Sequence, residues 1–219
     1  PGRFRGLAER ARTARERQVA VTLDPLAGGI IEMANSIRGH QNFFMDMASN
    51  QDFAEALLDR ITDFFEAFYE KALTAAGKDI DIVFFGDDYG MQSNMIISPR
   101  MWRKMIKPRL ARLIAKIKNT ADVYFQLHSC GAISPIIGDL VEIGVDILNP
   151  LQPNAAGMDL PAIKETYGDQ LIFHGVVDQQ SVLPAGSVDD VREEVKTRLR
   201  QMAPGGGYIL AVSPNIQAD

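Results

Sequence analysis

Apolar runs of strand length alternate six times with segments of helical periodicity, and this alternation restricts the chain to few folds. The strand-like runs are at 18–23, 81–85, 123–127, 145–148, 171–175 and 208–212. Apolar residues recur at helical spacing between them, chiefly at 30–39, 50–77, 98–117, 134–144, 159–168 and 187–199. Repeated strand–helix units predict parallel strands joined by crossover helices, so the sheet should be buried on both faces.

Several residues mark the expected helix boundaries. Asp159 and Ser187 stand at N-cap positions, and Ser187 with Asp190 resembles a capping box. Pro108 lies inside the 98–117 segment and should kink that helix, because proline lacks the backbone N–H that the helix needs.

Two architectures fit the alternation, an open doubly wound sheet and a (β/α)8 barrel. No Gly-x-Gly-x-x-Gly follows any predicted strand, so a dinucleotide-binding sheet has no support. The strands end instead in polar or turn residues, which in a barrel converge on one mouth. We therefore predict an α/β fold of the (β/α)8 TIM-barrel type, with residues 1–219 as a single partial domain. The chain should supply about six of the eight βα units, since a complete barrel takes about 250 residues. About two N-terminal units and a C-terminal helix are expected to be absent from it.

The most informative strand end is the segment 123–131, which finishes in His-Ser-Cys-Gly. Side chains alternate along an extended backbone, so His128 and Cys130 should project to the same side. An imidazole and a thiolate placed in this way are ligands that zinc prefers. In the alternative interpretation, Cys130 is a small buried hydrophobe and His128 is an ordinary hydrogen-bonded histidine.

Three further residues at strand ends are candidates for catalysis. Asp87 and Asp88 suit general acid–base chemistry or metal binding, and the alternative for both is a turn that caps a following element. His174 ends a predicted strand, where the site residues of a barrel lie; alternatively it is a hydrogen-bonded core histidine.

Four residues are candidates for substrate binding: Tyr89, Asn149, Gln152 and Asp178. The amides of Asn149 and Gln152 can hydrogen-bond a ligand or simply close the Asn-Pro turn beside them. Asp178 can orient a substrate or cap a loop.

Charge and composition exclude several classes of partner. The formal net charge is −5 and the pI is about 5.3, which is a poor match for nucleic-acid binding. The six arginines within 1–17 are therefore assigned to a solvated helix face rather than to an anion-binding arm. No apolar run approaches a membrane span, and no signal peptide is visible, so no membrane association is expected. A single cysteine excludes an internal disulfide, which suits a cytoplasmic protein.

Short motifs spread over nearly the whole chain resemble a known group of enzymes. The most telling are Gly-Asp-Asp-Tyr-Gly at 86–90, Leu-His-Ser-Cys-Gly at 127–131 and His-Gly-Val-Val-Asp at 174–178. Further matching segments are at 97–99, 107–108, 144–150 and 214–217. Together they resemble the uroporphyrinogen decarboxylase superfamily, which includes cobalamin-dependent methyltransferases. The resemblance implies a (β/α)8 barrel with its active site in the barrel mouth.

The methyltransferase branch of this superfamily holds zinc with a His-x-Cys pair and a later cysteine, and His128 and Cys130 match the pair. The resemblance thus implies zinc-dependent transfer of a methyl group from a methylcorrinoid (cobalamin) to a small-molecule thiol. It also implies a corrinoid protein as a further partner. Pro214 stands near the place of the later cysteine and cannot ligate through its side chain. A third ligand must then come from an Asp of the 86–90 loop or from a residue outside this chain.

Two alternatives remain open. In the first, the chain belongs to the decarboxylase branch, whose members act as carboxy-lyases on a tetrapyrrole without metal. The segments that would match the decarboxylases' tetrapyrrole-binding residues would precede Pro1, and the His-x-Cys pair is not a feature of the decarboxylases. A barrel that has lost catalysis and serves as a binding subunit is the second alternative, favoured by the missing cysteine. A partial barrel also exposes apolar inner faces of its terminal strands, so we expect the chain alone to aggregate or form a homodimer.

Overall fold

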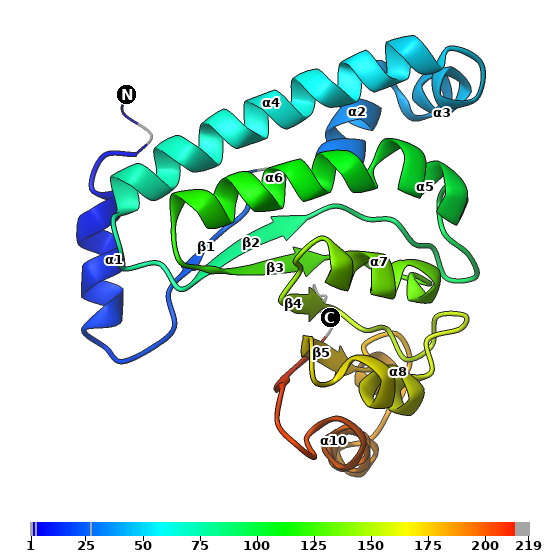
Figure 1. The fold of residues 1–219 in the computed structure, drawn as a ribbon. Helices are drawn as coiled ribbons and strands as arrows, with labels where there is room; N and C mark the ends of the chain where they lie inside the picture. Colours follow the sequence, from blue (N-terminus) through cyan, green and yellow to red (C-terminus); the bar gives the residue numbers. More distant parts are fainter. Residues whose placement is uncertain (1, 3, 27, 213–219) are drawn as a thin grey trace. The chain divides into compact units, whose positions relative to one another are not determined.

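The computed structural model describes residues 2, 4–26 and 28–212, and within them six strands form one sheet (Figure 1). The strands are β1 (Thr22–Leu23), β2 (Ile82–Gly86), β3 (Tyr124–His128), β4 (Ile147–Asn149), β5 (Ile172–Val177) and β6 (Tyr208–Val212). They are ordered β1-β2-β3-β4-β5-β6, and the pairs β1–β2, β4–β5 and β5–β6 are parallel. This sequential parallel order, with helices between the strands, confirms the predicted partial (β/α)8 barrel.

The helices follow the predicted pattern closely. They are α1 (Leu7–Arg15), α2 (Ile30–Arg38), α3 (His40–Ser49), α4 (Gln51–Ala76), α5 (Pro99–Met105), α6 (Lys107–Thr120), the 3-10 turn η1 (Ser134–Ile136), α7 (Ile137–Glu142), α8 (Leu160–Tyr167), α9 (Val182–Ala185) and α10 (Val188–Met202). The Asp159 side chain accepts from the Ala162 N–H, and Ser187 forms the predicted capping box with Asp190. The helix that carries Pro108 is interrupted just before it, at Ile106, as its missing N–H predicts.

Three elements differ from the prediction. The helix α3 was not expected, because Gly39 precedes it and no side chain caps its first turn. The four-residue α9 was also missed, since it contains Pro184 and has no side-chain cap. The first strand is shorter than 18–23, because Gln18 turns the backbone with a φ of 57° and Val19 is 53% exposed.

The chain divides into two compact units, one made of Pro1–Asp87 with Arg100–Gln126 and the other of Asp88–Pro99 with Leu127–Asp219. The expectation of one partial-barrel domain therefore stays a prediction. In the first unit α4 packs along α6, and Arg109 of α6 donates to both carboxylate oxygens of Asp59 on α4, at 2.8 and 2.9 Å. Because Arg109 is only 8% exposed, this paired contact fixes the two helices against each other.

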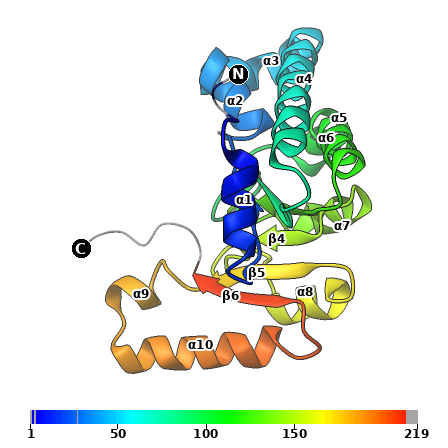
Figure 2. The ribbon, with the colours of Figure 1, turned by 90° about the vertical axis from the view of Figure 1, so that its left-hand side faces the viewer.

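The second unit is built on the parallel ladder of β4, β5 and β6. Ile147 pairs with Ile172, and Phe173 pairs with Tyr208. The helix α10 packs on β5 and α8, as Figure 2 shows. Among the residues that the structure describes, no helix is both long enough and apolar enough to cross a membrane.

Candidate metal centre

Three potential metal ligands from two strand ends lie together in the second unit. The ligand atoms of Asp88, His128 and Cys130 are all within 4.8 Å of one another. Cys130 Sγ is 3.5 Å from His128 Nε2, and Asp88 Oδ1 is 3.7 Å from the same nitrogen. The three residues are neither buried nor fully exposed, so an ion could reach them from solvent. Thiolate, imidazole and carboxylate are the donor types found in zinc sites, so the residues present fit this metal.

Two glycines bring Asp88 to the end of β3. A Cβ on Gly90 would stand 2.6 Å from the Cys130 carbonyl oxygen, and a Cβ on Gly131 would stand 2.5 Å from the Gly90 carbonyl carbon. The main chains therefore touch at a distance that only glycine allows, and Gly131 also has a φ of 82°. This close approach lets Asp88 Oδ1 accept a hydrogen bond from the Cys130 N–H at 2.7 Å.

Asn149, at the end of β4, supports the imidazole of His128. Its Oδ1 is 2.8 Å from His128 Nδ1, and its Nδ2 donates to the His174 carbonyl oxygen at 3.2 Å. Its own carbonyl oxygen accepts from the Ser129 N–H at 2.7 Å. A histidine that binds a metal through one ring nitrogen commonly hydrogen-bonds a neighbouring group through the other, as His128 Nδ1 does with Asn149.

The other residues predicted to bind substrate make structural contacts. Gln152 Oε1 accepts from the Gly131 N–H at 2.7 Å, so this amide holds the chain just after Cys130. Tyr89 is fully buried, and its N–H donates to Ser129 Oγ at 2.9 Å. In the structure Asn149, Gln152 and Tyr89 each hydrogen-bond a residue at or just after the end of β3. Substrate binding by these three residues stays a prediction.

Asp87 belongs to the first unit and serves a different purpose from Asp88. Its buried carboxylate accepts hydrogen bonds from the N–H groups of Ile31 and Glu32, at the start of α2. Gly29 makes this possible, because a Cβ there would lie 2.2 Å from Asp87 Cβ. A carboxylate at a helix N-terminus satisfies donors that the helix cannot pair itself. Asp87 thus caps a helix, as the alternative interpretation proposed, but the helix precedes it in the chain rather than follows it.

His174 and Asp178 lie at and after β5. Burial and the neighbouring His128 charge lower the pKa of the half-buried His174. Burial raises the pKa of Asp178, but hydrogen bonds from Ser181, Asn154 and Gln180 outweigh it and hold that pKa below its ordinary value. The Asp178 carboxylate accepts from the N–H groups of Gln180 and Ser181, which matches the loop-capping alternative. The catalytic role of His174 and the substrate-orienting role of Asp178 stay predictions.

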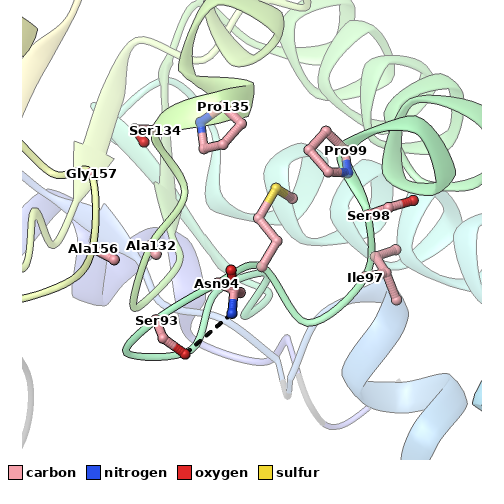
Figure 3. Close-up of a pocket in the computed structure, with 11 residues that line it drawn as sticks. Ser93, Asn94, Ile97, Ser98, Pro99, Ala132, Ser134, Pro135, Ala156 and Gly157 are labelled. Carbon is pink, nitrogen blue, oxygen red and sulfur yellow. Dashed lines mark hydrogen bonds between the residues drawn. The ribbon is translucent and has the colours of Figure 1, made fainter.

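A cleft of about 480 Å³ opens among the loops of the second unit (Figure 3). Its walls come from the loops after β2, β3 and β4, and include Ser93, Asn94, Met95, Ser134, Pro135 and Gly157. No signal in the sequence indicated this cleft, because its lining has no charged side chain, although the lining includes residues 97–99 of a segment that matches the family. The segment 213–219, with Pro214 near the place of the family's later cysteine, lies outside the described residues.

Together the strand order and the ligand cluster define a partial (β/α)8 barrel with a candidate metal centre at its strand ends. The uroporphyrinogen decarboxylase (URO-D) family model matches residues 2–219, and the chain therefore belongs to this family of enzymes. No curated protein matches the chain.

Two solved structures share the fold. A methyltransferase from Methanosarcina mazei superposes with a TM-score of 0.74 at 21% identity, covering 96% of this chain and 59% of that one. The apo crystal structure of the 3-keto-D-glucoside 4-epimerase YcjR from E. coli gives a TM-score of 0.58 at 17% identity, covering 99% of this chain and 80% of that one. This chain thus spans about 59% of the length of the methyltransferase.

Proposed function

We propose that the chain carries the metal-binding part of a methyltransferase, in which Asp88, His128 and Cys130 hold zinc and a small-molecule thiol accepts a methyl group from a methylcorrinoid. The observation that carries this proposal is the convergence of three different donor atoms within 4.8 Å at the ends of two neighbouring strands. Asp88 takes the place of the later cysteine in this proposal, so its assigned role is ligation rather than acid–base catalysis.

The charge of the cluster supports a divalent cation. A thiolate at Cys130 and a carboxylate at Asp88 provide two negative charges around a neutral imidazole, which balance one zinc ion. Catalytic zinc sites have three protein ligands and keep one position for water or substrate, and this set has that number. Bound zinc would lower the pKa of a thiol that coordinates it, so that the thiolate form is present at neutral pH.

The comparisons support the class of chemistry more than its details. Family membership is consistent with both decarboxylases and methyltransferases, and the Methanosarcina mazei protein is itself described as a methyltransferase. The Escherichia coli epimerase shows that the same fold also serves sugar chemistry. The thiol, the methylcorrinoid, a corrinoid protein and a second copy of the chain are accordingly proposed partners.

Metal content and activity test the proposal. The purified chain should contain one zinc per polypeptide, and it should demethylate methylcobalamin in the presence of a thiol. Asp88→Asn should lose zinc, because the amide keeps the acceptor for the Cys130 N–H but removes the charge. Asp159→Asn is the matched control, since it removes a carboxylate that caps α8 in the same unit.

Each contrary result has a definite meaning. A metal-free chain that decarboxylates uroporphyrinogen would establish the carboxy-lyase alternative. A metal-free chain that binds a corrinoid protein without turnover would establish the binding-subunit alternative. Zinc retained in full by Asp88→Asn would remove Asp88 from the ligand set.

A further inference from the structure

The side-chain amide of Asn149 has only one orientation that its neighbours allow. One end of the amide lies 3.2 Å from the His174 carbonyl oxygen, and the other end lies 2.8 Å from His128 Nδ1. A carbonyl oxygen only accepts hydrogen bonds, so the amide nitrogen must face His174. The amide oxygen must then face His128.

This orientation determines which nitrogen of His128 carries the proton. An amide oxygen only accepts, so the hydrogen bond to it requires the proton on Nδ1. In the neutral ring the lone pair then lies on Nε2, the nitrogen 3.5 Å from Cys130 Sγ and 3.7 Å from Asp88 Oδ1. We propose that Asn149 is a positioning residue that holds His128 as the Nδ1–H tautomer and so directs Nε2 to the metal centre.

Asn149 is well placed to enforce this choice. It is 7% exposed, and its carbonyl oxygen is held by the Ser129 N–H at 2.7 Å. The other tautomer would set two acceptors, Nδ1 and Oδ1, against each other at 2.8 Å with little water to separate them. Leaving buried acceptors unpaired is costly, so the Nδ1–H form is strongly favoured.

The inference rests on the proposed function only in naming the metal as the user of Nε2. The tautomer is a property of the metal-free chain, so it is measured without metal, corrinoid or thiol. Failure of the tautomer prediction and failure of the methyl-transfer proposal are therefore separate results.

The direct test is the pattern of ring-nitrogen shifts in a long-range proton–nitrogen NMR spectrum of the metal-free chain. The chain has three histidines, so substitution of His40 and of His174 by Gln assigns the His128 signals. The spectrum is recorded at several alkaline pH values, and the pattern is read where it no longer changes with pH. We expect His128 as the Nδ1–H tautomer, and an Nε2–H pattern in the wild-type chain would overturn the proposal.

Two variants of Asn149 separate positioning from mere packing. Asn149→Asp keeps an acceptor for His128 Nδ1–H but loses the donor to His174, so it should be less stable and yet retain the tautomer. Asn149→Leu removes both bonds and should release His128 to a mixture of tautomers. Gln152→Leu is the control, because it removes the other amide that supports the β3 end while leaving the Asn149 bonds intact.

Zinc affinity provides a second readout, by competition with a chromophoric chelator. Asn149→Leu should weaken zinc binding by about 10- to 100-fold, the range usual for loss of a group that orients a ligand. Asn149→Asp should bind zinc with most of the wild-type affinity, although it is less stable than the wild-type chain. Equal tautomer populations in the wild-type chain and Asn149→Leu would refute the assignment. If Asn149→Leu does not fold, the wild-type spectrum together with that of Asn149→Asp decides the question.

Discussion

The carboxylate of Asp88 accepts a hydrogen bond from the main-chain N–H of Cys130 at 2.7 Å, which joins the loop after β2 to the end of β3. The same oxygen lies 3.7 Å from His128 Nε2. One side chain therefore fixes the backbone of one candidate ligand and stands beside the ring of another. The arrangement predicts that Asp88 matters for both the geometry and the charge of the centre.

Comparison of Asp88→Asn with Asp88→Ala should separate these two contributions. Both variants should lose zinc affinity by at least about tenfold, because both remove a negative ligand. Only Asp88→Ala also removes the acceptor for the Cys130 N–H, so it alone should lower the midpoint of thermal unfolding. Calorimetry of the metal-free variants measures the second effect, and equal midpoints would show that the hydrogen bond contributes nothing to stability.

The single cysteine makes metal binding directly observable. Zinc on Cys130 should slow its reaction with a thiol reagent, and a chelator should restore the reaction, because the coordinated sulfur is no longer a free nucleophile. Cys130→Ser should lower zinc affinity at least about 100-fold while changing the unfolding midpoint little. Cobalt substitution offers an independent check, since a cobalt–thiolate charge-transfer band should appear in the wild-type chain and vanish in Cys130→Ser. Zinc that leaves the rate of thiol modification unchanged would contradict ligation by Cys130.

Gly131→Ala should disrupt the centre through the backbone. Its φ of 82° disfavours a side chain, and the new Cβ would meet the Gly90 main chain at 2.5 Å. Gly205→Ala is a matched control in the same unit, because Gly205 has a φ of 76° but nothing within 4 Å of a Cβ. We expect about 1–2 kcal/mol of destabilisation at position 205, from the left-handed backbone alone. The loss of unfolding free energy in Gly131→Ala should exceed that in Gly205→Ala, and Gly131→Ala should also lose zinc. Chemical denaturation measures both free energies. Equal values would mean that the structure readily relieves the contact between the new Cβ and Gly90.

The stability of the first unit should depend on Asp81 in a pH-dependent way. A hydrogen bond from Arg15, followed by one from the Val21 N–H, holds the pKa of Asp81 below its ordinary value. A carboxyl group with a lowered pKa in the folded state stabilises the fold above its unfolded pKa of about 3.9, and the stabilisation is lost as the pH falls through the folded value. The wild-type chain should therefore be more stable than Asp81→Asn at pH 7, and the difference should shrink progressively below about pH 4. Denaturation series of both proteins at several pH values test this, and a constant difference would exclude Asp81 as the titrating group.

Local signals in the sequence were sufficient to predict much of the fold. The caps at Asp159 and Ser187 lie within three residues of the groups they bind, so they can be recognised without tertiary structure. The strand at Tyr208–Val212 was predicted to the residue, because its apolar run follows three glycines. Pairing of His128 with Cys130 also follows from local geometry, since alternate residues of an extended chain share a face.

Long-range contacts could not be predicted in the same way. Asp87 binds the Ile31 N–H, a partner 56 residues earlier in the chain, and nothing around either residue indicates the other. Asp88 was one of the alternatives for a third ligand, but the sequence does not show the contact between Gly90 and Gly131 that brings it beside His128 and Cys130. The supporting roles of Asn149 and Gln152 depend on which strands are neighbours, so their amides suggested substrate binding when considered alone.

The contact between Gly90 and Gly131 also has an evolutionary consequence. The placement of the ligands at this centre depends on the contact between two main chains, so substitutions of the surrounding side chains should change it little. Core residues of the barrel can be exchanged for others of similar volume while Asp88 and Cys130 keep their spacing. Neither glycine has that freedom, because any side chain would have to occupy space already filled by backbone. Mutational tolerance in this region should therefore be lowest at two residues that carry no chemistry of their own.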